Sequence, residues 1–242
     1  KDELGFTDPF YSVNVGYDNQ LYILFQETAP QPIAVGIARF PNTVADTKYC
    51  IAVITIDWEN LKMVSKNIIP LGKLTMNFRS VLPLGDEYLL VGYRCHYQEG
   101  DPELNALVVD KEGQKVREFC LGDGISYVFT TPEDNIITGY FDEGVFGNFG
   151  WNDPIGSCGL IKWDKNGSKV WTNTKYGIDD VYAMDYFKNN LYFYFYYSFI
   201  LVKTNFEEEK IIEIGNKGFS NITVSEDEKK LIVDGGYDKR NT

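Results

Sequence analysis

The sequence predicts an all-β protein built from a repeated four-stranded unit, and three observations support this prediction. A unit that begins with a glycine and an apolar residue, or with a similar short segment, and continues with two strand-length apolar segments occurs five times. Its copies begin at Gly5, Met76, Gly124, Gly177 and Gly218. Val, Ile, Tyr, Phe and Thr dominate these segments, and no window shows the 3.6-residue periodicity of a helix. The closest two starts are 41 residues apart, near the roughly 40 to 45 residues of one blade of a β-propeller. We therefore predict a β-propeller of four-stranded blades, with strands a, b, c and d in chain order.

Each repeat opens with a hairpin of strands a and b, in which a polar turn joins two apolar strands. The five hairpins cover residues 10–24, 79–92, 127–140, 182–195 and 221–235. In the fourth repeat, the tyrosine-rich run from Leu191 to Tyr197 is predicted to be a core strand with neighbouring blades on both of its faces.

A second hairpin, of strands c and d, follows in the first four repeats. These hairpins cover residues 51–68, 106–122, 159–177 and 199–218. The turns Asp110 to Gly113 and Asp164 to Gly167 each supply an Asp that can accept hydrogen bonds from its own backbone and a Gly that tolerates positive φ. The charged segment 207–210 is expected to be a solvated turn.

The repeat pattern predicts one domain over residues 1–242, with about five blades and the last one incomplete. The fifth repeat shows only its a and b strands before Thr242. Because an unclosed ring leaves sheet edges open, we expect further blades in a longer chain. A small closed ring and closure by a second chain are the alternatives. A β-sandwich is the competing fold, but it does not explain a four-strand unit that repeats with its turn chemistry.

The c–d hairpin of the third repeat carries a family resemblance. Residues 159–171 form an apolar strand, an Asp-x-x-Gly turn and a Trp, which is similar to a unit of PQQ-like blades. On this pattern the chain resembles the broad bacterial β-propeller superfamily that includes WD40-like and PQQ-like repeats. It departs from WD40 repeats because Trp163-Asp164 precedes a turn, and from PQQ enzymes because it has no adjacent cysteine pair. The resemblance implies a fold and not an activity.

The composition argues against several classes of partner. The chain has 35 acidic and 23 basic residues and a formal net charge of -12, so a nucleic acid partner is not expected. Its apolar runs are strand-length, far short of the roughly 20 residues of a membrane-spanning helix. We therefore expect a soluble protein without a membrane partner, either cytoplasmic or exported after removal of a leader. One histidine and four well-separated cysteines predict no zinc site and no cofactor.

Candidate binding residues lie in the connections between strands b and c, which share one face of a propeller with the d–a connections. The third repeat has the most unusual b–c connection, residues 142–157, with four glycines, three aromatic residues and three carboxylates. The rings of Phe146, Phe149 and Trp151 could present flat apolar faces to a sugar or a peptide. Asn148 could form hydrogen bonds to the edge of that ligand. Alternatively, the loop folds its own aromatic side chains back onto neighbouring blades.

The same loop offers oxygen ligands for a metal ion. The carboxylates of Asp142, Glu143 and Asp153, with Asn148 beside them, suit Ca²⁺, which takes six to eight such groups in flexible geometry. The spacing lacks the regular alternation of a dedicated calcium loop.

The b–c connection of the second repeat is short and acidic and begins with His96 and Tyr97. His96 could act as a general base beside Glu99, Asp101 or Glu103, although a lone histidine in a loop is more often a surface residue. We expect His96 and Tyr97 to contribute to the same binding face as the loop of the third repeat.

The sequence therefore predicts a non-catalytic binding or interaction module that recognises a small molecule, a glycan or a protein segment on its b–c face. Scarce histidine and the absence of a nucleophile motif favour binding over catalysis. The first alternative is a hydrolase or lyase that uses carboxylates or a bound metal at the same face. The second alternative is a structural scaffold.

Overall fold

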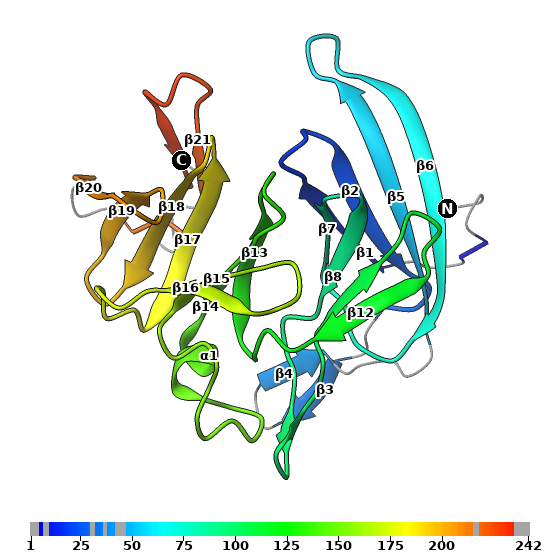
Figure 1. Cartoon of the computed structure of the whole chain (residues 1–242), viewed down its shortest axis with the longest axis horizontal. Coiled ribbons are helices and arrows are strands. Elements are labelled where there is room, and N and C mark those ends of the chain that lie inside the picture. The colour runs from blue at the N-terminus through cyan, green and yellow to red at the C-terminus, as the bar shows by residue number, and fades with distance from the viewer. Residues whose placement is uncertain are drawn as a thin grey trace. The chain divides into compact units, whose positions relative to one another are not determined.

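The predicted repeat forms four-stranded antiparallel sheets whose strands follow chain order from one edge to the other (Figure 1). The computed structural model describes residues 5–6, 10–29, 32–35, 38–41, 47–214 and 218–234. The chain divides into two compact units. Unit 1 comprises Lys1–Cys95, Pro102–Leu121 and Thr130–Asn135, and unit 2 comprises His96–Asp101, Gly122–Phe129 and Ile136–Thr242. A single domain over the whole chain stays a prediction.

Unit 1 contains the first two sheets. Sheet 1 consists of β1 (Phe10–Val15), β2 (Leu21–Gln26), β5 (Thr47–Asp57) and β6 (Lys62–Leu74). Sheet 2 consists of β7 (Ser80–Leu84), β8 (Glu87–Val91), β11 (Ala106–Val109) and β12 (Lys115–Phe119). A further hairpin, of β3 (Pro32–Val35) and β4 (Ala38–Pro41), lies in the connection between β2 and β5. The core between the two sheets includes Tyr22, Tyr49 and Leu90.

Unit 2 contains the other two four-stranded sheets. Sheet 3 consists of β13 (Ile125–Thr130), β14 (Ile136–Tyr140), β15 (Leu160–Trp163) and β16 (Lys169–Thr172), and sheet 4 of β17 (Asp180–Phe187), β18 (Asn190–Tyr196), β19 (Ile200–Thr204) and β20 (Glu209–Ile212). Shorter elements are β9 (Tyr97–Gln98), β10 (Asp101–Pro102), α1 (Asp142–Phe146), β21 (Ile222–Val224) and β22 (Leu231–Val233). No helix in the described part of the chain has the length and apolar character that crossing a bilayer requires.

The tyrosine-rich strand β18 is buried on both faces, which confirms its predicted place in the core. Leu191, Phe193 and Phe195 pack toward sheet 3 in one apolar cluster. Tyr192 and Tyr194 belong to a second cluster with residues of β21, on the opposite side. The side chains alternate because successive residues of a strand point to opposite faces of the sheet.

The c–d turns of the four sheets share one device, the hydrogen bonding of a side-chain oxygen to backbone N–H groups of the same turn. Asp110 Oδ1 accepts from the N–H groups of Glu112 at 3.1 Å and Gln114 at 2.8 Å. Asp164 Oδ1 accepts from Asn166 and Ser168, both at 2.9 Å. Gly113 and Gly167 have φ of 83° and 82°, as the predicted turns require. Asp57 and Asn205 play the same part in sheets 1 and 4.

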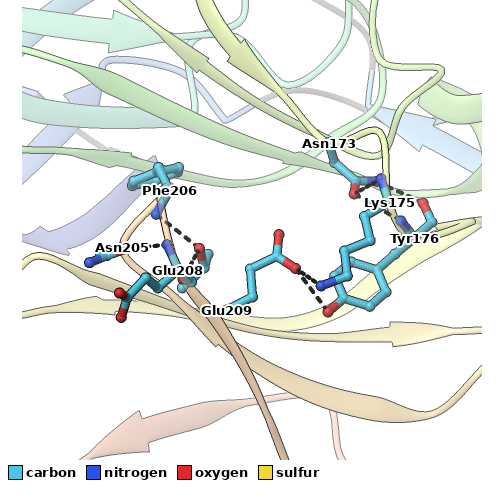
Figure 2. Close-up of polar contacts among 8 residues, drawn as sticks. Asn173, Lys175, Tyr176, Asn205, Phe206, Glu208 and Glu209 are labelled. Atoms are coloured by element: carbon cyan, nitrogen blue, oxygen red, sulfur yellow. Dashed lines mark hydrogen bonds and ion pairs between the residues drawn. The ribbon is translucent and has the colours of Figure 1, made fainter.

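Figure 2 shows the turn of sheet 4 and a contact that sequence reasoning missed. Asn205 Oδ1 accepts from the N–H groups of Glu207 and Glu208. Segment 207–210 is not simply a solvated turn, because Glu209 begins β20. Its carboxylate lies 2.6 Å from Lys175 Nζ and accepts from the Tyr176 hydroxyl at 3.1 Å. Sheet 4 is thereby tied to the connection that follows sheet 3.

Replacing Asp110 with Ala should lower the free energy of unfolding by about 1 to 2 kcal/mol, because two backbone N–H groups lose a charged acceptor. Chemical denaturation of the purified protein would measure the change. Glu112→Ala alters an exposed side chain of the same turn and should change the stability by less than about 0.5 kcal/mol. Equal losses in the two variants would contradict the assigned role of Asp110.

Candidate ligand-binding surface

The b–c connections of the second and third repeats come together in unit 2. The backbone N–H of Tyr97 donates to the carbonyl oxygen of Phe149 at 2.9 Å. The ring of His96 lies 4.6 Å from that of Phe149, and the ring of Tyr97 lies 4.9 Å from that of Trp151, measured between centroids. Four of the six predicted binding residues therefore form one contact cluster, although the two segments are about fifty positions apart in the sequence.

Gly150 makes this close approach possible. Its φ of 88° is favourable only for glycine. A side chain at this position would also overlap the carbonyl oxygen of Tyr97. The glycines of this loop were predicted to allow tight turns, and Gly150 additionally lets two segments of backbone touch.

The three aromatic residues of the 142–157 loop have different surroundings. Phe146, at the end of α1, is 67% exposed, and Phe149 is half-buried. The ring of Trp151, expected at the surface, is only 6% exposed. Its ring packs against that of Tyr97, so the loop turns Trp151 inward, as the alternative interpretation of this loop had it.

Asn148 organises the backbone of the same loop. Its side-chain oxygen accepts from the N–H of Phe149 at 2.8 Å, and its carbonyl oxygen accepts from the N–H of Trp151 at 2.9 Å. This pattern holds the segment between α1 and Trp151 in one conformation. Asn148 is half-buried, so its amide group remains partly accessible.

The predicted calcium ligands lie on or near α1. Asp142 and Asp153 are exposed, and Glu143 is half-buried. Asp142 Oδ1 accepts the N–H of Glu143 at 2.7 Å. Among the described residues, no group of three or more His, Cys, Asp or Glu side chains is arranged to hold a metal ion. Calcium binding by these three residues stays a prediction.

A carboxyl group that the sequence did not single out, that of Asp180, is affected by the charge of Asp142. Asp180 begins β17 and is half-buried. Burial, and then the negative charge of Asp142, raise the pKa of Asp180 from 3.8 to about 6. No sequence pattern could have shown this pairing, because the two residues are joined only through the fold.

The end of β18 exposes three aromatic side chains. Two of them, Tyr196 and Tyr197, belong to the run predicted to be a core strand, and Phe199 is the first residue of the predicted c–d hairpin. Tyr196, Tyr197 and Phe199 are 39%, 73% and 45% exposed. Asp180 pairs with Tyr196 across β17 and β18, so both side chains lie on one face of the sheet. The sequence offered one indication of this exposure. The run from Leu191 to Tyr197 is longer than an average strand, so its last residues could be expected to extend beyond the core.

We give the name b–c surface of unit 2 to segments 96–101, 141–159 and 196–199 together with Asp180. It presents exposed aromatic rings and carboxylates on a backbone held by hydrogen bonds. Such a surface can stack on a flat or compact ligand and bond to its polar groups.

Trp151→Ala should lower the free energy of unfolding by about 3 kcal/mol, because it empties a buried site. Phe146→Ala, in the same loop, should change it by less than about 0.5 kcal/mol because the ring is exposed. Thermal and chemical unfolding of the two variants would measure both effects. A large loss with Phe146→Ala would place that ring in the core.

The raised pKa of Asp180 predicts a pH dependence of stability. Between pH 3.8 and about 6 the folded state keeps a proton that the unfolded state has lost. The contribution of Asp180 to the unfolding free energy therefore falls as the pH rises through this window and is constant above it. Asp180→Asn should therefore make the unfolding free energy depend less on pH in this window. At pH 7 it should stabilise the protein by on the order of 1 kcal/mol, a value reduced because solvent screens this half-buried group.

Chemical denaturation at a series of pH values would test the effect of Asp180→Asn. Asp153→Asn removes one exposed negative charge from the same unit and controls for the change in net charge. Identical slopes for the wild type and Asp180→Asn between pH 4 and pH 6 would contradict the prediction.

Comparisons with known proteins show a likeness of fold. No protein-family model and no curated protein matches the chain. Among solved structures, Kluyveromyces lactis Hsv2 aligns with a TM-score of 0.54 at 9% identity, over 95% of this chain and 57% of that one. The extracellular domain of BT4673 from B. thetaiotaomicron aligns with a TM-score of 0.48 at 11% identity, over 92% of this chain and 31% of that one. The chain thus spans less than two thirds of either structure. Together with the four-stranded antiparallel sheets, the likeness to Hsv2 shows a propeller-like all-β fold.

Proposed function

We propose that this protein is a non-catalytic binding module whose b–c surface in unit 2 recognises a small ligand, a glycan or a protein segment. The observation that carries the proposal is the joining of segments 96–101 and 149–151 by a backbone hydrogen bond and two ring contacts. A surface that is already ordered loses little conformational entropy when a ligand binds.

The side chains of this surface favour recognition over chemistry. The exposed rings of Phe146 and Tyr197 offer apolar area that a ligand could cover. The neighbouring carboxylates of Asp142 and Asp180 would accept hydrogen bonds from hydroxyl or amino groups. Their charge, added to the acidic balance of the whole chain, disfavours nucleic acid and other polyphosphates.

We further propose that the sheets are blades of a propeller related to WD40-like and PQQ-like repeats, with β21 and β22 as the first strands of a fifth blade. The uniform a-b-c-d strand order supports this assignment. So does the packing of β21 against sheet 4, where Phe219 stacks on Tyr194 at 4.1 Å.

The outward face of β1 favours contact with another sheet. Tyr11, Val13 and Val15 alternate along β1 and are each at least half exposed. A further blade of a longer chain, or a sheet of a partner, would bury this apolar face. A scaffold role would follow from the second arrangement.

An enzymatic role is the second candidate, and the Asp142–Asp180 pair favours it. A carboxyl group with a pKa of about 6 can serve as a general acid near neutral pH, with a second carboxyl group, that of Asp142, in the same unit. Two such groups are the catalytic pair of many glycoside hydrolases. Turnover of a nitrophenyl glycoside that is lost in Asp180→Asn would establish this role in place of simple binding.

The binding proposal predicts that a ligand raises the thermal midpoint and that exposed rings of the b–c surface are needed for the rise. Anything that binds the folded state stabilises it by linkage. Thermal unfolding of the full chain would be measured with sugars, amines, short peptides, and Ca²⁺ with and without a chelator. Phe146→Ala should abolish the shift given by a true ligand of this surface.

Leu61→Ala is the matched control, because it removes a 79% exposed side chain from unit 1. It should leave the ligand-induced shift unchanged. A shift that survives Phe146→Ala and other substitutions on the b–c surface would place the site elsewhere. A calcium-dependent rise lost in Asp142→Asn would identify the predicted metal site.

A further inference from the structure

The turn after β18 contains an arrangement of rings that folding does not explain. We call Tyr196, Tyr197 and Phe199 the aromatic corner. The ring of Tyr196 is nearly perpendicular to that of Tyr197, at 6.0 Å and 85°, and to that of Phe199, at 5.2 Å and 88°. The preceding residues Phe193, Tyr194 and Phe195 are fully buried. The aromatic residues of the chain therefore change from buried to exposed at the end of β18.

The backbone fixes the aromatic corner. The N–H of Phe199 donates to the carbonyl oxygen of Phe195 at 3.0 Å, which closes the turn. The N–H of Asp179 donates to the carbonyl oxygen of Tyr196 at 3.1 Å. The ring of Tyr182 lies 5.7 Å from that of Tyr196 and 6.2 Å from that of Phe199. The exposed rings are thus supported from beneath by a half-buried one.

Negative charge adjoins the aromatic corner. Asp180 lies opposite Tyr196 in the β17–β18 register, and Asp142 acts on Asp180 by charge. Among the described residues, no basic side chain is one of the groups that shift the pKa of Asp180.

We propose that the aromatic corner, together with Asp180, binds an alkylammonium cation, the kind of group carried by choline or by a methylated lysine side chain. This inference rests on the proposed function and names the ligand class for that surface. Ring faces attract cations through their quadrupoles, most strongly where neighbouring groups exclude water. Rings set at right angles can contact a compact, rounded cation from more than one side, whereas a flat sugar ring is better matched by a single face.

The carboxylate of Asp180 supplies what the rings cannot, a full opposing charge. An alkylammonium ion has apolar methyl or methylene groups around its charge, so it can contact the rings while the carboxylate of Asp180 neutralises it. An anionic ligand would meet repulsion from that carboxylate. A neutral ligand of the same shape would gain ring contacts alone.

The test compares choline with 3,3-dimethylbutan-1-ol, its neutral analogue of nearly the same shape, on the full chain by isothermal titration and by ligand-observed NMR. Choline should bind, and the neutral analogue should bind at least about tenfold more weakly, because only the cation gains attraction to the rings and the carboxylate. Equal binding of the two compounds, or no binding of choline, would overturn the inference. An acetylated trimethyllysine amide and phosphocholine then distinguish a peptide source from a lipid headgroup.

Variants locate the site. Tyr197→Ala should weaken choline binding by about two- to fivefold with an unchanged thermal midpoint, because this ring is 73% exposed. Tyr197→Phe keeps the ring and should bind choline as the wild type does. Asp180→Asn should weaken binding by removing the opposing charge. Tyr11→Ala, which removes a 61% exposed tyrosine from unit 1, is the matched control and should have no effect.

Choline binding that Tyr197→Ala and Asp180→Asn leave unchanged would also overturn the assignment. Failure of this inference can be told apart from failure of the proposed function. If the thermal screen finds a ligand that depends on Phe146 while choline does not bind, the binding module stands and the cation assignment falls.

Discussion

The alternation of side chains along β18 is the constraint on which unit 2 depends. Leu191, Phe193 and Phe195 are committed to one apolar cluster, and Tyr192 and Tyr194 to another. A shift of one residue in the pairing of β18 would exchange the two sets and disrupt both clusters, so the register with β17 is strongly specified. That register is also what sets Asp180 opposite Tyr196. The position of the acidic and aromatic groups at the strand end is therefore a consequence of core packing far from them.

The c–d turns and the b–c connections are stabilised by different kinds of contact. The c–d turns are short, and in each sheet an Asp or Asn accepts hydrogen bonds from the backbone of its own turn. Such turns are locally determined and leave little room for variation. The b–c connections of the second and third repeats are instead held by contacts with each other, such as the hydrogen bond from Tyr97 to Phe149. Because these connections do not have to satisfy a fixed turn, they can differ in length and carry recognition.

The parts of the fold that depend on local chemistry were predictable from the sequence. The paired turns at Asp110 and Asp164, the hairpin repeat and the burial of β18 follow from residue spacing and strand alternation. For His96 and Phe149 the sequence predicted only that their loops share one face, not that the two rings are in contact. For Trp151 the residue type alone could not distinguish an exposed ring from a buried one. Asp180 and the exposed end of β18 were missed because their character comes from neighbours such as Asp142, which lies 38 positions earlier. Whether the b–c surface binds a ligand stays a prediction.

The close approach of Gly150 to Tyr97 has a consequence for how this surface could change during evolution. The two loops share a backbone hydrogen bond, and the space between them admits no side chain at position 150. A residue inserted in one loop would displace the other, so the two segments cannot lengthen or shorten independently. Related chains that use this surface for different ligands should therefore show compensating length changes in both loops. In contrast, the turn at Phe199, closed by its own hydrogen bond to Phe195, could exchange its aromatic residues one at a time.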